Sequence, residues 1–185
     1  SNLKINLRIK NKIDINLDSF LKTLKMKLFI SQKDSHNKTD LARPFQLINK
    51  TNQFNLNGRR ISKNFLTKLL NDGGKLFTGS YKDNNGDFGE IICILIDKHK
   101  NVISFVMSCR VFQRNIEYVF LRELIKSGII IKRLNFKKTE KNDPFFDFIK
   151  DLRKNLDKKN NLINLGQLLK NFSSRSKLFA LNKIK

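Results

Sequence analysis

The sequence has few cysteines and no long apolar run, and each scarcity excludes a class of protein. Its two cysteines, Cys93 and Cys109, both lie in apolar, strand-like stretches. A disulfide framework is therefore not expected, and a reducing, cytoplasmic location is favoured. No apolar run approaches the roughly 20 residues that a membrane-spanning helix needs, and no signal peptide opens the chain. We therefore expect a cytoplasmic protein that does not enter a membrane.

Motifs of several common enzymes and metal sites are also missing. The chain has no Walker loop, no Gly-x-Ser-x-Gly nucleophile elbow and no dinucleotide-binding glycine fingerprint. It also lacks the Asp-x-Asp that phosphatases carry at the end of an apolar strand. His36 and His99 have no ligand-like spacing to the cysteines, so no metal site is expected. These absences argue against standard phosphoryl transfer and zinc chemistry.

Acidic residues are scarce, and this makes the chain strongly basic. Sixteen Asp and Glu oppose 38 Lys and Arg, a formal net charge of +22. Such a field attracts nucleic acids, acidic proteins and phosphate-bearing ligands. However, 28 of the basic residues are Lys and Asn is abundant, as an AT-rich coding bias would produce. The charges are spread along the chain rather than gathered in a stripe, so specific nucleic-acid binding is not expected. An acidic protein or a phosphorylated ligand stays open.

The length of 185 residues, with 39% hydrophobic and 29% charged residues, fits one globular domain. Ser1-Asn2 resembles a cloning scar and no Met opens the chain, so we expect the sequence to begin within a longer protein. We expect a strand or linker segment at 1–16, a folded domain at 17–152 and a basic helical extension at 153–185.

Hydrophobic periodicity predicts an α+β fold with helices packed on a mixed sheet. Short connections between the central strands favour antiparallel hairpins. Ser62 and either Thr39 or Asp40 are expected helix caps, and Gly128 is an expected helix stop. The expected strands are 3–16, 26–30, 75–81, 90–97, 102–111 and 129–136, and the expected helices are 19–24, 41–48, 63–70, 115–127 and the stretch from Pro144.

The tripeptide Ser108-Cys109-Arg110 ends the longest expected strand and precedes a helix. A thiol beside a fixed cation and near a helix N-terminus has a lowered pKa and a larger thiolate fraction. Alternatively, Cys109 is a small core residue, the commoner fate of a cysteine in such a run. Arg110 and Arg114 could bracket a phosphate, or Arg114 could form a surface pair with Glu117.

Two further segments are rich in polar residues. The amide-rich stretch Asn52-Gln53-Phe54-Asn55 could present donors and acceptors to a ligand or could tie a loop together. The stretch from Asp83 to Gly89 contains Asp87 and two glycines, and a turn is sufficient to explain it. Neither segment alone identifies a chemistry.

Together, four blocks in order resemble the C-terminal part of FkbH-like proteins of the HAD-IIIC class. The stretch 46–60 matches Q-L-x-x-K-T-N-Q-F-N-L-x-x-R-R, and 83–89 matches the turn D-x-F-G-D-x-G except for Asn85, where Phe is typical. The stretch 108–117 matches S-C-R-V-x-x-R-x-[VI]-E, and 139–148 matches T-x-K-N-x-x-x-x-D-F. The resemblance covers roughly residues 20 to 152.

The resemblance implies a fold and an activity. FkbH-like proteins pair a phosphatase-like domain of the haloacid-dehalogenase class with a GNAT-like acyltransferase domain, which this chain resembles. The implied fold is a GNAT-like α+β domain with a mixed, largely antiparallel sheet and helices on both faces. Family members move a glyceryl unit from a phosphoglycerate donor to an acyl-carrier protein in polyketide and related pathways, and others are tied to surface-polysaccharide clusters. The expected partners are therefore an acyl-carrier protein and the phosphatase-like domain.

The resemblance also implies roles for individual residues. Cys109 becomes a candidate acyl-carrying thiol and Arg110 a stabiliser of the oxyanion, with Glu117 or Asp87 as a general base. The candidate binding residues are Asn52, Gln53, Asn55, Arg59, Arg60, Ser108, Arg114 and Asn142. The expected cofactor is a phosphopantetheine thioester or coenzyme A.

One departure from the family pattern bears on coenzyme A. The family usually has Gly at position 113 and often Gly at position 115, whereas this chain has Gln113 and Asn115. The Gln113 and Asn115 side chains lie in the loop where GNAT enzymes bring backbone N–H groups close to the pyrophosphate of coenzyme A. Gln113 and Asn115 therefore argue against coenzyme A binding in that mode. Two alternatives to the carrier-protein acyltransferase stay open: a coenzyme-A-dependent N-acetyltransferase acting on an amine or amino sugar, and a non-catalytic docking module that binds a carrier protein through the basic tail.

Overall fold

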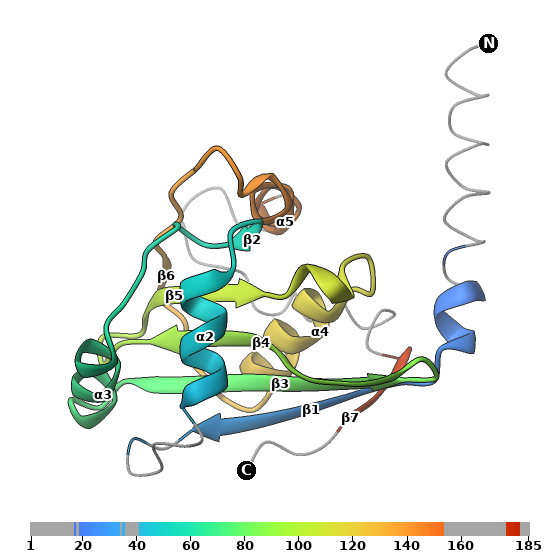
Figure 1. The fold of residues 1–185 in the computed structure, drawn as a ribbon, viewed down its shortest axis with the longest axis horizontal. Helices are drawn as coiled ribbons and strands as arrows, with labels where there is room; N and C mark the ends of the chain where they lie inside the picture. The colour runs from blue at the N-terminus through green and yellow to red at the C-terminus, as the bar shows by residue number, and fades with distance from the viewer. Residues whose placement is uncertain (1–16, 18, 34, 36–40, 154–176, 182–185) are drawn as a thin grey trace.

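The computed structural model describes residues 17, 19–33, 35, 41–153 and 177–181, which are drawn as coloured ribbon in Figure 1. The strand expected at 3–16, most of the extension expected at 153–185 and the cap expected at Thr39 or Asp40 lie outside these residues. The described residues form an α+β fold around one mixed, mostly antiparallel sheet, as the sequence predicted.

The predicted elements occur in their predicted order of strand, two helices, three strands, helix, strand and helix. The structure adds a two-residue strand at 54–55 between the two helices, a 3-10 turn at 109–111 and a strand at 179–181. Residues 19–23 are helical and precede the first strand. The helices are α2 (Ala42–Lys50), α3 (Lys63–Asn71), the 3-10 turn η1 (Cys109–Val111), α4 (Ile116–Lys126) and α5 (Asp143–Arg153). The strands are β1 (Met26–Lys33), β2 (Phe54–Asn55), β3 (Lys75–Asp83), β4 (Gly86–Ile96), β5 (Asn101–Met107), β6 (Arg133–Leu134) and β7 (Phe179–Leu181).

The sheet is built on the three strands that follow one another in the chain. Its order is β2-β5-β4-β3-β1-β7, with β6 also paired to β5. β3, β4 and β5 are antiparallel neighbours, and β1 pairs antiparallel with β3. The pairs β5–β6 and β1–β7 are parallel. The predicted antiparallel hairpins are therefore confirmed.

Apolar side chains cover both faces of the central strands. In β4, Cys93 and Leu95 belong to a core cluster with residues of α2 and α3, whereas Ile92 and Ile94 belong to a cluster with residues of α4 and α5. Figure 1 shows α2 crossing in front of the central strands and α4 behind them. Removal of this apolar surface from water on both faces drives the helices onto the sheet.

Local signals at the ends of α3, α4 and α5 act as expected, whereas the N-cap of α2 is Leu41, which makes no side-chain cap, and not Thr39 or Asp40. The hydroxyl of Ser62 accepts a hydrogen bond from the Phe65 N–H at 3.1 Å and caps α3. Gly128 follows the C-cap of α4 with a φ of 85°, the left-handed conformation that glycine adopts at low cost. Pro144 lies in the first turn of α5, where it removes no hydrogen bond within the helix.

Two predicted strands are too long. The strand expected at 102–111 ends at Met107, and the chain turns into η1 instead. The strand expected at 129–136 shrinks to Arg133–Leu134, because only these residues pair with β5, at Asn101 and Val102. Its apolar residues instead pack against the core around α4, with Ile131 buried and Phe136 partly buried.

Among the described residues, no helix has the length and apolar character to cross a membrane.

Candidate functional site

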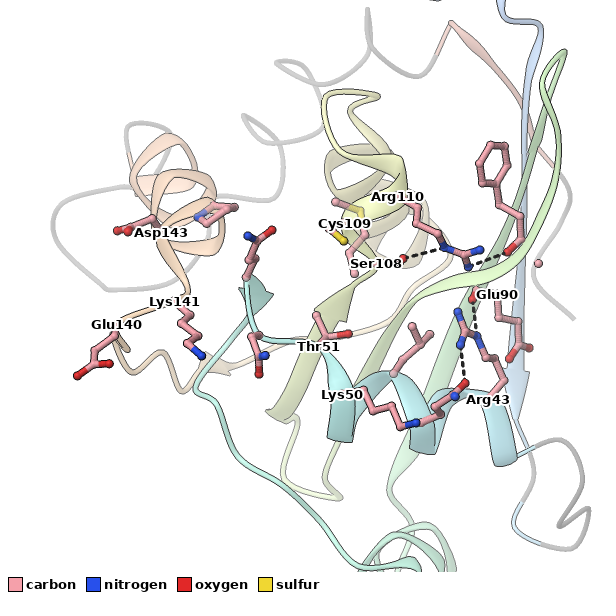
Figure 2. A pocket seen from close by; sticks show the side chains of 18 residues that line it. Arg43, Lys50, Thr51, Glu90, Ser108, Cys109, Arg110, Glu140, Lys141 and Asp143 are labelled. Atoms are coloured by element: carbon pink, nitrogen blue, oxygen red, sulfur yellow. Dashed lines mark hydrogen bonds between the residues drawn. The ribbon is translucent and has the colours of Figure 1, made fainter.

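An open groove of about 1070 Å³ lies where the end of α2, the end of β5 and the loop before α5 meet (Figure 2). Its walls come from α2 and the following loop up to Gln53, from Phe88–Glu90 at the start of β4, from Met107–Arg110 and from Glu140, Lys141, Asp143 and Pro144. Segments far apart in the chain therefore contribute to one surface.

Five of the twelve predicted site residues line this groove. They are Asn52, Gln53, Ser108, Cys109 and Arg110. The other seven do not line it, and most of them hold neighbouring segments in place. They are Asn55, Arg59, Arg60, Asp87, Arg114, Glu117 and Asn142.

Cys109 is exposed in the groove and begins η1. The Ser108 N–H makes a last cross-strand hydrogen bond to the Ile91 carbonyl at 2.7 Å, after which the chain turns. Val111, at the other end of η1, is fully buried and anchors the turn, so Cys109 remains at the surface. The alternative that Cys109 is a buried core residue is wrong.

Cys93 has the opposite environment. It lies on β4 beneath α2, fully buried, with its Sγ 3.9 Å from the Pro44 carbonyl oxygen. Burial raises the pKa of the Cys93 thiol. Cys93 is therefore a core residue, as the apolar run around it predicted, and the two cysteines differ sharply in their access to solvent.

Arg110 and Arg114 do not face one common ligand. Arg110 lines the groove, and its guanidinium donates to the Ser108 hydroxyl at 3.3 Å and to the Phe88 carbonyl at 3.4 Å (Figure 2). Arg114 lies against the β3–β4 hairpin, where its Nε is 3.4 Å from a carboxylate oxygen of Asp83. The expected phosphate bracket is therefore not formed, and Arg114 pairs with Asp83 rather than with Glu117.

Both candidates for a general base lie outside the groove lining. Asp87 is exposed at the start of β4, 2.7 Å from the Lys82 ammonium. The hydrogen bond from Lys82, followed by the one from the Gly89 N–H, lowers the pKa of the Asp87 carboxyl, which weakens it as a base. Glu117 is half-buried in the first turn of α4.

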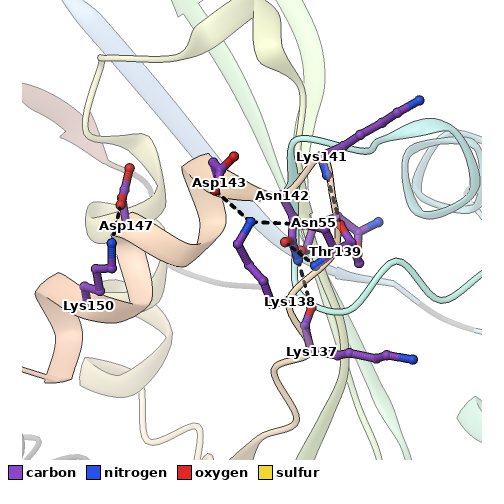
Figure 3. Close-up of polar contacts among 9 residues, drawn as sticks. All are labelled: Asn55, Lys137, Lys138, Thr139, Lys141, Asn142, Asp143, Asp147 and Lys150. Carbon is purple, nitrogen blue, oxygen red and sulfur yellow. Dashed lines mark hydrogen bonds and ion pairs between the residues drawn. The ribbon is translucent and has the colours of Figure 1, made fainter.

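Asn55 and Asn142 tie two walls of the groove together (Figure 3). The side-chain amide of Asn142 donates to the carbonyls of Asn55 and Lys137, both at 2.9 Å, and its oxygen accepts from the Thr139 N–H at 2.7 Å. The amide of Asn55 donates to the Thr51 carbonyl at 2.9 Å. Both side chains are buried, so they position the loops that carry the lining residues.

Arg60 closes the end of α2. One guanidinium nitrogen donates to the carbonyls of Ile48 and Thr51, at 2.9 and 3.0 Å, and another donates to the side chain of Asn52. These contacts satisfy carbonyl groups that a helix C-terminus leaves without partners. Arg59 lies over the Phe65 ring, 4.6 Å from its centroid. Arg60 thus supports the groove from outside, whereas Arg59 packs on α3 away from it.

Sequence reasoning missed several charged residues of the groove. Arg43 and Lys50 lie on α2 with the neutral Gln46 between them, at spacings of three and four residues, which places these polar side chains on one helical face. That periodicity is visible in the sequence and could have identified them. Glu90, Glu140, Lys141 and Asp143 complete the charged lining.

Among the described residues, no group of three or more His, Cys, Asp or Glu could hold a metal ion.

The chain matches no family model, and comparisons with curated proteins and with solved structures found no match. The resemblance to FkbH-like and GNAT-like proteins therefore stays a prediction.

Proposed function

We propose that this chain is the GNAT-like acyltransferase domain of an FkbH-like protein, with Cys109 as the acyl-carrying nucleophile. The observation that carries the proposal is the exposed Cys109 thiol in a groove beside Arg110 and the amides of Asn52 and Gln53. The donor supplies an activated acyl group of the glyceryl type, and the acceptor is the phosphopantetheine thiol of an acyl-carrier protein.

The transfer proceeds in two steps. In the first, the Cys109 sulfur attacks the carbonyl carbon of the donor and a C–S bond forms. The donor's leaving group departs with its electron pair, and the thiol proton passes to solvent. In the second, the carrier sulfur attacks the thioester carbon and a new C–S bond forms. The bond to the Cys109 sulfur breaks, Cys109 leaves with the electron pair, and the proton of the carrier thiol returns to it through solvent. In this proposal, Arg110 and the nearby amides stabilise the negative oxygen of each tetrahedral intermediate, an effect of about 3–4 kcal/mol for a well-placed donor.

Two features of the fold support the GNAT-like reading. The mixed, mostly antiparallel sheet with helices on both faces is the architecture that the resemblance implies. In the loop between η1 and α4, Gln113 and Asn115 have φ values of 65° and 60°. These are the positions at which the resembled family has glycine, and the backbone adopts the left-handed conformation that glycine favours.

The positive net charge of the chain supports an acidic acyl-carrier protein as its partner. Acyl-carrier proteins are acidic, and a chain with a net charge of +22 attracts an acidic partner over the range of the Debye length. This attraction speeds the encounter and delivers the phosphopantetheine arm to an open groove. It also predicts that transfer slows as the ionic strength rises.

The decisive experiment is intact-protein mass spectrometry after incubation with activated acyl donors, with the phosphatase-like domain supplied as a separate protein. We expect an acyl adduct on the native chain and none on Cys109→Ala. The Cys93→Ala variant is the matched control, because it removes a thiol from the core and should keep the adduct. An adduct that survives in Cys109→Ala, or is missing from the native chain while the partner domain is active, would contradict the proposal.

The second candidate is a coenzyme-A-dependent N-acetyltransferase acting on an amine or amino sugar. The left-handed backbone at Gln113 and Asn115 favours it, because this loop leads into the N-terminus of α4, where backbone N–H groups bind phosphates in GNAT enzymes. This activity needs no cysteine. Saturable acetyl-CoA binding that is unchanged in Cys109→Ala would support it, and no binding at millimolar acetyl-CoA would eliminate it.

A further inference from the structure

The carboxylates that line the groove do not neutralise it. Glu90 is held by a lysine outside the lining: its Oε1 lies 2.5 Å from the Lys33 ammonium. Asp143 is held in the same way, with its Oδ1 2.7 Å from the Lys138 ammonium. Glu140 is exposed, and in Figure 2 its carboxylate points away from the groove. Two of the three carboxylates therefore form ion pairs with lysines that do not line the groove, and the third faces solvent.

The cations of the groove have no such compensation. The Arg43 guanidinium donates to the Glu90 backbone carbonyl at 3.1 Å and to the Gln46 side-chain oxygen at 2.5 Å, and both acceptors are neutral. The acceptors of Arg110 are neutral as well. Within the described part of the chain, no carboxylate pairs with the ammonium of Lys50 or Lys141. Four positive charges from three segments therefore line one hollow without carboxylate partners.

We propose that this groove binds a phosphate-bearing ligand through Arg43, Lys50, Arg110 and Lys141. A phosphate monoester carries close to two negative charges and three acceptor oxygens, which matches several separate cations better than one carboxylate does. Arginine offers a planar fork of donors to such an oxyanion, and lysine supplies a point charge. This site does not depend on acyl transfer, because it follows from the charges of the groove alone.

Cys109 lines the same groove and can report the local field. Because Cys93 is buried, alkylation of the native protein measures Cys109. Iodoacetate is an anion and iodoacetamide is neutral, so the ratio of their rates cancels the intrinsic reactivity of the thiol. At low ionic strength we expect this ratio to exceed that of a small neutral thiol by about tenfold, the lower end of the range for electrostatic focusing in a charged cleft.

Variants of the lysines test which charges produce the effect. Lys50→Gln and Lys141→Gln should each lower the rate ratio several-fold, and the double variant should bring it close to that of the small thiol. Lys132→Gln removes the same charge from an exposed position outside the groove and should leave the ratio nearly unchanged. A ratio that is equal in the native protein and the double variant would overturn the proposal, and so would an equal fall in the Lys132 variant.

Competition identifies the ligand chemistry. Inorganic phosphate and a simple phosphate monoester should each protect Cys109 from iodoacetate in the millimolar range, and the lysine variants should need about tenfold more of either. Acetate and chloride at the same ionic strength should protect little. Equal protection by all four anions would mean general screening and would overturn the proposal. Protection by the monoester but not by inorganic phosphate would place the ester group in the site and still support it.

The two proposals fail separately. If Cys109→Ala loses the acyl adduct but phosphate does not protect Cys109, acyl transfer stands and the phosphate site is wrong. If phosphate protects Cys109 but no donor gives an adduct, the phosphate site stands and the nucleophile is wrong.

Discussion

The guanidinium of Arg114 lies 3.4 Å from the Asp83 carboxylate and over the rings of Tyr81 and Phe88, at 5.8 and 5.7 Å. These contacts join the loop after η1 to the β3–β4 hairpin. The Asp83 side chain is fully buried and also accepts a hydrogen bond from the Tyr81 hydroxyl at 2.7 Å. Arg114 thus fixes the start of α4 relative to the sheet, although it does not reach the groove.

The Arg114→Ala variant should lower the free energy of unfolding by about 2–4 kcal/mol, because it leaves a buried carboxylate without its cation. Urea denaturation measures the change. Arg133→Ala is the control, since Arg133 is exposed on β6, and it should change stability by no more than about 0.5 kcal/mol. In the Arg114→Ala background, Asp83→Asn should cost less than it does in the native chain. Simple additivity of the two changes would show that they do not interact.

The free energy of unfolding should decrease as the pH falls, and part of this decrease should come from protonation of Asp83. Burial alone would raise the pKa of the Asp83 carboxyl, but hydrogen bonds from Tyr81 and Asn85 and the charge of Arg114 lower that pKa below its ordinary value. A group with a lowered folded-state pKa stabilises the protein above its unfolded pKa, and this contribution is lost as the pH falls through the folded pKa. The loss should begin near pH 4 and continue below it.

Urea denaturation between pH 6 and about pH 2.5 checks this dependence. The Asp83→Asn variant should be less stable near neutral pH and should lose less stability on acidification than the native chain. Asp97 also has a lowered carboxyl pKa: burial opposes the shift, and hydrogen bonds from Asn101 and the His99 N–H outweigh it. Part of the acid dependence should therefore survive in the Asp83 variant. Identical slopes for the two chains would contradict the assignment to Asp83.

The Asn142→Asp variant tests the junction between the two loops of the groove. The new carboxylate cannot donate to the carbonyls of Asn55 and Lys137, so two buried hydrogen bonds are lost and a charge is placed against acceptors. We expect a loss of about 2–4 kcal/mol in urea denaturation. Asn64→Asp is the matched control: Asn64 is exposed in the first turn of α3, where a negative charge is tolerated or slightly favourable. A smaller loss for Asn142→Asp than for the control would refute the bridging role.

The Gln113→Gly variant tests the loop before α4. Gln113 has a φ of 65°, which costs a non-glycine residue about 1 kcal/mol or more, while glycine adds flexibility to the unfolded chain. We therefore expect Gln113→Gly to be neutral or to stabilise by less than about 1 kcal/mol in thermal or urea denaturation. A β-branched side chain is strained further at this φ, so Gln113→Val should destabilise. If the N-acetyltransferase candidate is right, Gln113→Gly should also bind acetyl-CoA more tightly.

The parts of the fold that local signals control could be predicted from the sequence. The continuous apolar run of β4, the cap at Ser62 and the stop at Gly128 each depend on residues close together in the chain. The ends of β5 and β6 could not be predicted in this way, because they depend on distant partners. On the edge of β5 that faces away from β4, one end pairs with β2 and the other end pairs with β6. Only two residues of the run from Ile129 to Phe136 can therefore pair with β5.

The site was predicted in part for a similar reason. Ser108, Cys109 and Arg110 line the groove, as the thiol beside a cation suggested. The amide-rich stretch divides, however: Asn52 and Gln53 line the groove, whereas Asn55 points into the protein because β2 pairs with β5 there. Arg43 and Lys50 were missed because a polar helical face is ordinarily exposed to solvent, and only the packing of α2 beside the end of β5 shows that this face lines a groove.

The parallel pairing of β1 with β7 has a consequence for the order of folding. The strands β3, β4 and β5 are joined by tight connections, so their hairpins can form with little loss of chain entropy. β1 must close a much longer loop to reach β3, and β7 pairs with β1 from near the other end of the chain. Such non-local contacts form late because their loop-closure entropy is lost before any contact compensates for it. Substitutions in the central hairpins should therefore slow folding, whereas substitutions in β7 should mainly speed unfolding.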